Sequence, residues 1–312
     1  MRIVTPHTII LGECPAPGIK TLEWIESAAR TCYKSEERIT ENSAREMVKT
    51  LLNKEHLAML EHSNVVFRVC TTTTNPRGLE TSLRRIFRER TAYHKFYIHD
   101  GVLHISGNLR AWIESLTNPL GMLTDFSIIQ ELRYLIWENF STLVPPVEPP
   151  PFKTFETVMN PEEIPMALKR ITVKFICDRG VSHAIVRHRP CSFAQESTRF
   201  CNYSQEKFGN ECSFIEPPGL SPKQRAHWLS LCMFAEEKYL AMLDEGCSPQ
   251  IARSVLPNCT KTEIVVTADV DEWNIISKLR CSPAAHPQFR ELMLPLNEAL
   301  AKRFNGVLKI TK

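Results

Sequence analysis

The densest group of chemically capable side chains lies between Arg187 and Arg199. This stretch, RHRPCSFAQESTR, places three arginines, a histidine, two serines, a threonine and a glutamate within 13 residues. Guanidinium groups stay charged at any working pH and bind phosphate oxygens in pairs, and hydroxyl groups donate to the oxygens that remain. The stretch therefore predicts an anion site. The simpler interpretation is an exposed basic loop paired with Glu196, or a non-specific nucleic-acid contact.

The spacing within this stretch favours the anion site. Arg187, His188 and Arg189 are followed by seven residues and then Ser197, and the chain continues as TRF. This R-H-R-x7-S pattern resembles the signature of the flavin-dependent thymidylate synthases. Other blocks resemble the family in the same order: AARTCYKS (28–35), KEHLAMLEHS (54–63), CDRGVSH (177–183), ARSVLPN (252–258), TEIVVT (262–267) and KLRCSPAAHPQFRE (278–291).

The resemblance implies an enzyme that methylates deoxyuridine monophosphate (dUMP) at carbon 5. It also implies FAD bound near the Arg-His-Arg turn, with NADPH and methylenetetrahydrofolate as cosubstrates. Active sites would form between the subunits of a homotetramer. No metal is implied, and no cysteine nucleophile is needed, so Cys191 is expected to be a small packing residue.

The resemblance also assigns roles to individual residues. The residues expected to bind dUMP are Arg187, Gln195, Ser197, Arg199, Arg253 and Arg280, with Arg253 supplied by a second subunit. Arg280 is the expected catalytic residue, because a fixed cation beside the uracil ring stabilises its N3-deprotonated form and pushes electron density toward carbon 5. Without the resemblance, Arg253 and Arg280 would be assigned to salt bridges at helix ends.

The residues expected to contact FAD are His56, Glu61, Arg187, His188, Arg189, Gln195, Asp269 and Asp271. His56, Glu61 and His62 stand at the end of a predicted helix, where they could instead act as helix caps. His286, in AAHPQ, is open to the same two interpretations.

Four positions on the flavin side depart from the family pattern. Ala184 replaces a glutamate or glutamine, Asp269 an asparagine, Asp271 an arginine, and Ile275 a histidine or asparagine. An anion in place of a cation should weaken the binding of a pyrophosphate through like-charge repulsion. Two alternatives therefore stay open: another carbon 5 transfer such as hydroxymethylation, and a non-catalytic nucleotide-binding relative that has lost the flavin.

The composition limits the classes of partner. The chain has 312 residues, of which 43% are hydrophobic, and its charge of +3 comes from 38 basic and 35 acidic residues mixed along the chain. We therefore expect a sizeable core and no general nucleic-acid or membrane surface. No apolar stretch is long enough to span a bilayer, and the eleven cysteines include no C-x-x-C pair. We expect a cytoplasmic protein with reduced thiols.

The elements that must position these residues alternate between helix and strand. Apolar residues recur at helical spacing over 21–33 and about 40–60, whereas 64–70 and 171–177 are rich in β-branched residues and predict strands. Further segments predict helices from about 182 and over 222–245, 249–256, 272–279 and 289–304, and a strand over 261–269. Because no β-α-β repeat occurs, we expect an α+β fold with a mixed or antiparallel sheet flanked by helices.

A long stretch interrupts the blocks that resemble the family. Residues 71–170 contain a helical run near 109–116 and prolines at 145, 146, 149, 150 and 151, which mark a linker or extended surface segment. We predict that 1–70 and 171–312 form one domain and that 71–170 is an insertion of unknown role.

Overall fold

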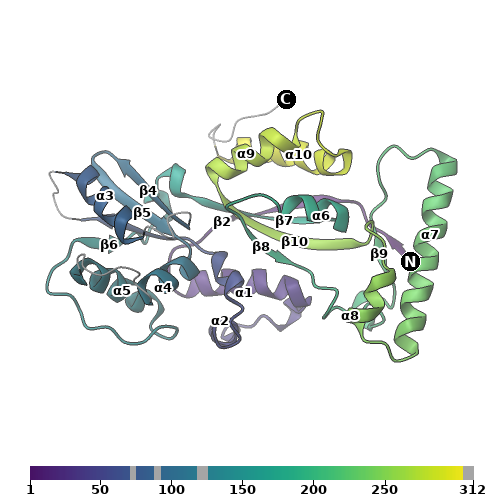
Figure 1. Cartoon of the computed structure of the whole chain (residues 1–312), viewed down its shortest axis with the longest axis horizontal. Coiled ribbons are helices and arrows are strands. Elements are labelled where there is room, and N and C mark those ends of the chain that lie inside the picture. The colour runs from purple at the N-terminus through teal and green to yellow at the C-terminus, as the bar shows by residue number, and fades with distance from the viewer. Residues whose placement is uncertain (71–74, 88–92, 118–125, 305–312) are drawn as a thin grey trace.

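The computed structural model describes residues 1–70, 75–87, 93–117 and 126–304. Parts of the predicted insertion, 71–74, 88–92 and 118–125, thus lie outside the described residues. Two four-stranded antiparallel sheets follow one another along the long axis, and a helical unit occupies the far end (Figure 1). The α+β fold with an antiparallel sheet flanked by helices is confirmed.

The sheet beneath the arginine motif has the order β2 (His7–Glu13), β7 (Arg170–Asp178), β10 (Lys261–Asp269) and β8 (Ser192–Gln195). One face of β7 and β10 packs in a single core with α6 (Arg179–Ile185), α9 (Val270–Arg280) and α10 (Pro287–Arg303). The other face meets α1 (Ile19–Tyr33), so α10 and α1 lie on opposite sides of the sheet (Figure 1). The predicted strands β7 and β10 are confirmed, whereas β2 and β8 were not predicted.

The predicted helix over about 40–60 is confirmed only in its first part. Helix α2 (Ser43–Asn53) ends early, Glu55 takes a positive φ of 56°, and a separate 3₁₀ helix, η2 (Leu57–Glu61), follows. The physical reason is that residues 53–56 are all polar, so the apolar face of α2 stops after Leu51 and Leu52.

A buried carboxylate ties α1 to this sheet. Glu263 on β10 pairs with Lys34 at the end of α1 (2.9 Å), Lys174 on β7 (2.5 Å) and Lys261 on β10 (2.6 Å). Burial alone would raise the pKa of Glu263, but the lysine charges and hydrogen bonds outweigh it and hold that pKa well below its usual range. Glu196, just after β8, shares Lys261 at 2.9 Å. We call Glu263, Glu196 and the three lysines the lysine–glutamate network.

A buried histidine makes a second connection through this face. His62, directly after η2, is fully buried, and its Nδ1 lies 2.8 Å from Thr267 Oγ1 on β10. Thr267 Oγ1 lies 2.8 Å from Thr172 Oγ1 on β7. Burial, followed by the charge of Arg170, lowers the pKa of His62 to about 3. His62 is thus a neutral core residue rather than a helix cap.

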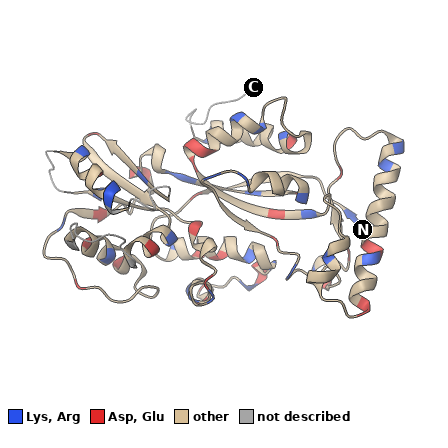
Figure 2. Cartoon of the chain, viewed as in Figure 1, with Lys and Arg blue, Asp and Glu red and all other residues tan. Residues whose placement is uncertain are grey.

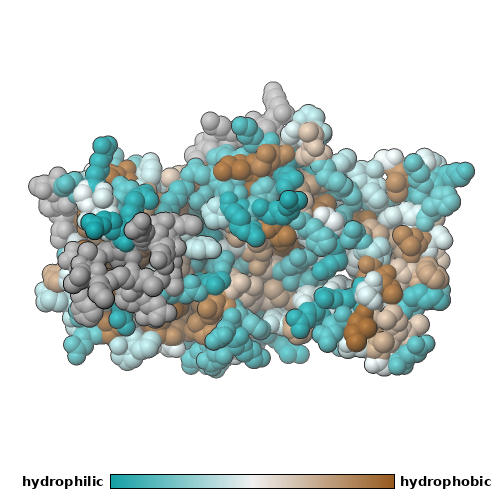
Figure 3. Space-filling view, viewed as in Figure 1, coloured by the Kyte–Doolittle hydropathy of each residue, from teal (hydrophilic) through white to brown (hydrophobic). Residues whose placement is uncertain are grey.

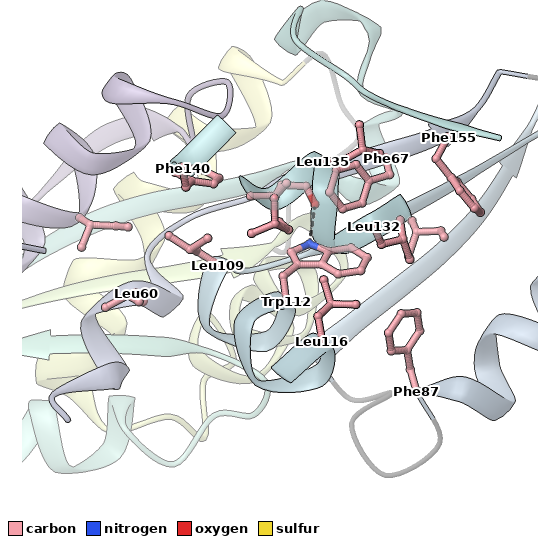
Figure 4. Close-up of a cluster of buried hydrophobic side chains, with 14 of the residues drawn as sticks. Leu60, Phe67, Phe87, Leu109, Trp112, Leu116, Leu132, Leu135, Phe140 and Phe155 are labelled. Atoms are coloured by element: carbon pink, nitrogen blue, oxygen red, sulfur yellow. Dashed lines mark hydrogen bonds between the residues drawn. The ribbon is translucent and has the colours of Figure 1, made fainter. Parts of the chain in front are cut away.

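The second sheet has the order β4 (His94–His99), β5 (Val102–Gly107), β3 (Val65–Val69) and β6 (Phe155–Thr157). It packs with α3 (Pro76–Ile86), α4 (Leu109–Thr117) and α5 (Phe126–Phe140) around Trp112, whose Nε1 donates to Val65 O at 3.1 Å (Figure 4). The predicted strand over 64–70 and helix near 109–116 are confirmed, and 145–150 form no helix or strand. Strand β3 lies before residue 70, whereas its partners β5 and β6 lie after it, so one sheet contains residues from both sides of the predicted boundary. The predicted division into domains remains a prediction.

The far end is built on α7 (Pro222–Asp244), which packs with α8 (Pro249–Ala252) and near the parallel pair β1 (Arg2–Ile3) and β9 (Ser213–Phe214). Helix α7 is confirmed, but the predicted helix over 249–256 divides into α8 and a 3₁₀ turn, η7 (Arg253–Val255). Within the described residues, no helix combines the length and the apolar character needed to cross a membrane.

Replacing Glu263 by glutamine should destabilise the fold by about 3–5 kcal/mol, because three lysine ammonium groups would lose their shared buried counterion. Urea unfolding measures this change. The matched control is Glu37→Gln, since Glu37 is exposed and its nearest cation, Arg38, lies 3.7 Å away. The control should stay within about 0.5 kcal/mol of wild type. Equal unfolding midpoints for the two variants would contradict this account of the network.

The lowered pKa of His62 predicts a pH dependence of stability. The ordinary pKa of histidine is 6.5, and the folded pKa of His62 is about 3. Between these two pH values, His62 is protonated in the unfolded chain but not in the folded chain. Stability should therefore fall as the pH drops through this window, by up to about 1.4 kcal/mol per unit. His62→Gln should flatten the dependence measured by urea unfolding between pH 7 and 4.5. His227→Gln, at an exposed position on α7, should leave the slope unchanged.

Candidate functional site

The arginine motif begins in the turn that joins α6 to β8. Asp178 caps α6 by accepting a hydrogen bond from Val181 N, which explains why the helix starts at Arg179, before the predicted Ser182. After Ile185 the chain turns through Arg187, His188 and Arg189 and reaches β8 at Ser192. The two arginines are exposed, whereas His188 is only 7% exposed.

His188 turns inward and meets Arg280 at the end of α9. Arg280 Nε donates to His188 Nε2 at 3.0 Å, and its second contact is from Nη2 to Ala184 O at 3.4 Å. The ring of Phe289 lies 4.9 Å from the guanidinium carbon. Burial and the Arg280 charge lower the pKa of His188 to about 4, so the ring is neutral at pH 7. Because Nε2 accepts, the ring proton is on Nδ1.

The Nδ1 side of His188 faces a buried carboxylate, Glu272, whose Oε1 lies 3.8 Å away. Burial, followed by the nearby charge of Asp269, raises the pKa of Glu272 to about 7. Cys191 is also close to Glu272, and burial is the main cause that raises its pKa to about 12. Cys191 is therefore a thiol at neutral pH and is unsuited to act as a nucleophile.

The second half of the motif follows β8. Gln195 Nε2 donates to Ser182 Oγ at 2.9 Å and Thr262 Oγ1 at 3.1 Å, so this amide is fixed between α6 and β10. Ser197 Oγ accepts a hydrogen bond from Arg199 N at 3.3 Å. Arg253, at the start of η7, reaches the same turn, and its Nη1 donates to Thr198 Oγ1 at 3.4 Å.

The expected residues thus gather in two groups, one at each end of β8. Arg187, His188 and Arg280 lie at its start, and Ser197, Arg199 and Arg253 lie at its end. The four residues of β8, Ser192–Gln195, lie between the two groups of the motif in the sequence.

The arginines of both groups have no carboxylate partner. In the described part of the chain, arginine–carboxylate pairs involve Arg30, Arg38, Arg68, Arg84, Arg110 and Arg225. None involves the unpaired arginine set, which we define as Arg187, Arg189, Arg199, Arg253 and Arg280. Glu196, the expected partner in the simpler interpretation, is buried and pairs with Lys261 instead. Within the described residues, the motif is therefore a local source of positive charge. Figure 2 shows basic and acidic positions mixed along the rest of the ribbon.

Two carboxylates expected on the flavin side, Asp269 and Asp271, form ion pairs with a lysine of the same chain. Asp269 accepts from Glu272 N at 2.9 Å as the cap of α9, and Lys95 pairs with both Asp269 (3.3 Å) and Asp271 (2.5 Å). Lys95 lies on β4, within the predicted insertion, and nothing in the sequence indicated its role. The two carboxylates are thus partly neutralised, which the sequence analysis did not anticipate.

The other expected flavin contacts are dispersed. Glu61 pairs with Arg110 at 2.7 Å, and His56 is exposed with the Tyr33 hydroxyl 3.5 Å from its Nδ1. Arg189 is turned toward its own backbone, where its Nη1 donates to Val186 O at 2.5 Å and His188 O at 2.8 Å. Ile275 is 50% exposed on α9.

A small cavity lies where the two sheets meet. Its volume is about 50 Å³, and its lining includes Glu61, Lys95, Arg170, Cys191 and Asp269. Small-molecule sites usually measure roughly 300–1,000 Å³. This cavity is therefore smaller than a typical small-molecule site.

Comparisons with known proteins match the half of the chain that carries the motif. Residues 158–304 match the family model described as "Thymidylate synthase complementing protein". The "Flavin-dependent thymidylate synthase" of Geobacter sulfurreducens is 32% identical over 120 residues, which cover 38% of this chain and 50% of that protein. The enzyme of the same name from Thermococcus kodakarensis is 33% identical over 128 residues, covering 40% and 51%.

The chain thus spans about half the length of the curated relatives it matches. Among solved structures, it aligns with the "UMP/dUMP methylase PolB from Streptomyces cacaoi bound with 5-Br dUMP" at 14% identity and a TM-score of 0.42. That alignment covers 97% of this chain and 93% of that one.

The family match includes the whole motif and both loops that bring further arginines to it. Arg187–Arg199, Arg253 and Arg280 all fall inside residues 158–304, whereas the blocks at 28–35 and 54–63 lie outside. Residues 158–304, slightly less than half of the chain, are thus similar to the thymidylate synthase complementing protein family.

Proposed function

We propose that this protein binds dUMP and methylates carbon 5 of its pyrimidine ring, using FAD as cofactor and NADPH and methylenetetrahydrofolate as cosubstrates. The observation that carries the proposal is the unpaired arginine set on both sides of β8. Five guanidinium groups that have no carboxylate partner among the described residues would suit a phosphate and an electron-rich ring. The names of the sequence relatives, flavin-dependent thymidylate synthases, support the same reaction.

Arg280 is the catalytic residue of the proposal. His188, Ala184 O and Phe289 hold its guanidinium in place, so the cation would need little rearrangement to meet a uracil ring. A fixed cation there favours the N3-deprotonated ring and increases the electron density at carbon 5, where the new bond forms. Burial, followed by the charge of Arg187, lowers the pKa of Arg280, so the charge of Arg187 adds to the same field.

The phosphate would bind at the other end of β8. Ser197 and Arg199 supply a hydroxyl and a guanidinium from the turn. Gln195 has its Nε2 committed to Ser182 and Thr262, so it would meet the nucleotide through Oε1.

We propose that the protein assembles as a homotetramer with shared active sites. The separation of the two arginine groups supports this proposal, because a second subunit could place Arg253 beside the Arg187 end of a neighbouring site. Exposed apolar residues close to Arg253 offer a contact surface: Leu231, Met233 and Phe234 on α7, Ile251 on α8 and Val255 on η7. Hydrophobic surface gathers at this end of the molecule (Figure 3).

One observation favours a second candidate function. Lys95 occupies the two carboxylates on the flavin side, and the cavity beside them holds only about 50 Å³. A nucleotide-binding relative that has lost its flavin would show these features as well. When bound, FAD would supply the redox chemistry that NADPH sustains, and without it the arginines would still bind dUMP.

Replacing Arg280 by alanine should lower the rate of dTMP formation from dUMP about 100-fold or more, because a preorganised charge at the reacting ring is lost. Lys278→Ala, an exposed change on the same helix, is the matched control and should retain full activity. Thermal unfolding should be similar for both variants. Wild-type turnover in Arg280→Ala would remove Arg280 from the catalytic role.

Replacing Asp271 by arginine should tighten FAD binding, measured by quenching of flavin fluorescence with dUMP present. The change removes an exposed carboxylate beside the predicted pyrophosphate position and supplies a cation instead. Asp244→Arg makes the same charge change at the exposed end of α7 and should have no effect. Unchanged affinity in Asp271→Arg would show that Asp271 does not face the cofactor. If dUMP binds while no variant retains flavin after gel filtration, the second candidate function holds.

A further inference from the structure

Two thiols lie close together at the far end of the molecule, away from the catalytic residues proposed above. Cys232 is in the middle of α7, and Cys259 is in the turn just before β10. Their sulfur atoms are 3.6 Å apart, although 27 residues separate them in sequence. Cys232 is fully buried, whereas Cys259 is partly exposed.

The surroundings make the two thiols chemically unequal. The hydrogen bond from Cys232 is the main cause that lowers the pKa of Cys259, against the opposing effect of burial, and Trp228 lowers it further. The same hydrogen bond and burial raise the pKa of Cys232. Cys259 is therefore the more nucleophilic of the two thiols, and Cys232 lies close enough to react with it once Cys259 is oxidised.

We propose that Cys259 and Cys232 form an oxidation site that hydroperoxides convert to a disulfide. The Cys259 thiolate attacks one peroxide oxygen, the O–O bond breaks, and hydroxide leaves, giving a sulfenic acid on Cys259. The Cys232 thiol then attacks the Cys259 sulfur, the S–O bond breaks, and water leaves. Overall, two thiols and one hydrogen peroxide give one disulfide and two waters, and a thiol reductant reverses the change.

This site lies where α7 meets the segments that hold the arginine motif. The carbonyl oxygens of Asn258 and Thr260, on either side of Cys259, accept hydrogen bonds from Arg179 N at 3.0 and 3.1 Å at the start of α6. Helix α6 leads directly into the turn with Arg187. A disulfide would therefore fasten α7 to the turn that supports this helix.

A second path connects α7 to the end of β8. The hydroxyl of Tyr239, on α7, accepts a hydrogen bond from Tyr203 N at 3.3 Å, and the Tyr203 hydroxyl donates to Glu196 at 3.0 Å. The oxidised protein would thus have α7 fixed relative to both halves of the motif. The thiol chemistry itself does not depend on the proposed nucleotide function.

The test uses the full chain carrying Cys70→Ser, which removes an exposed thiol that could join two molecules. After exposure to hydrogen peroxide, free thiols are alkylated and the protein is digested for mass spectrometry. The expected result is a cross-linked peptide joining Cys232 and Cys259, which dithiothreitol separates. Trp228 fluorescence should fall as the disulfide forms, since a disulfide beside an indole quenches it.

Two further variants sharpen the test. Cys259→Ser should lose both the cross-link and the fluorescence change, whereas Cys212→Ser, a buried cysteine in the same cluster, should behave as the parent does. Recovery of Cys232 and Cys259 as free thiols in the parent, while other cysteines oxidise, would overturn the proposal. This result in the parent is decisive even if a variant fails to fold.

Discussion

The charge state of the site depends on how the buried carboxylates are paired. Glu263 and Glu196 take their counterions from Lys34, Lys174 and Lys261 on the α1 face of the sheet. Tyr203 completes the shell of Glu196 with a hydrogen bond. Because lysines are the counterions of both carboxylates, neither carboxylate pairs with the nearby arginines of the motif. If Glu196 turned toward Arg187 or Arg199, the anion site would be neutralised by its own chain.

The pairing of charged side chains also differs between the two sides of the proposed active site. On the nucleotide side, the cations are unpaired and Arg280 is held by neutral groups, a histidine ring, a carbonyl oxygen and a phenyl face. On the expected flavin side, Lys95 pairs with Asp269 and Asp271 and partly neutralises them, and Arg110 pairs with Glu61. Under the proposed function, the unpaired arginines would attract the nucleotide, whereas the carboxylates expected on the flavin side pair with cations of the same chain.

The sequence predicted those parts of the fold that depend on local pattern. The β-branched run over 261–269 and the apolar helix between Pro222 and Gly246 appear in the structure as β10 and α7. Strand β8 was missed because its four residues belong to the motif and show no strand periodicity. The spacing of the arginine motif predicted a set of candidate site residues, but not their partners in the structure. Lys95 meets Asp269 across 174 residues, and no local pattern carries such a contact.

The central claim is that the unpaired arginine set recognises the phosphate of a pyrimidine nucleotide. Isothermal titration of the protein with dUMP and with deoxyuridine, which lacks the phosphate, tests it most directly. The account predicts that dUMP binds about 100-fold or more tightly than deoxyuridine. Added salt should reduce this difference in affinity, because the attraction is between charges. Equal affinity for the two ligands at low salt would contradict it.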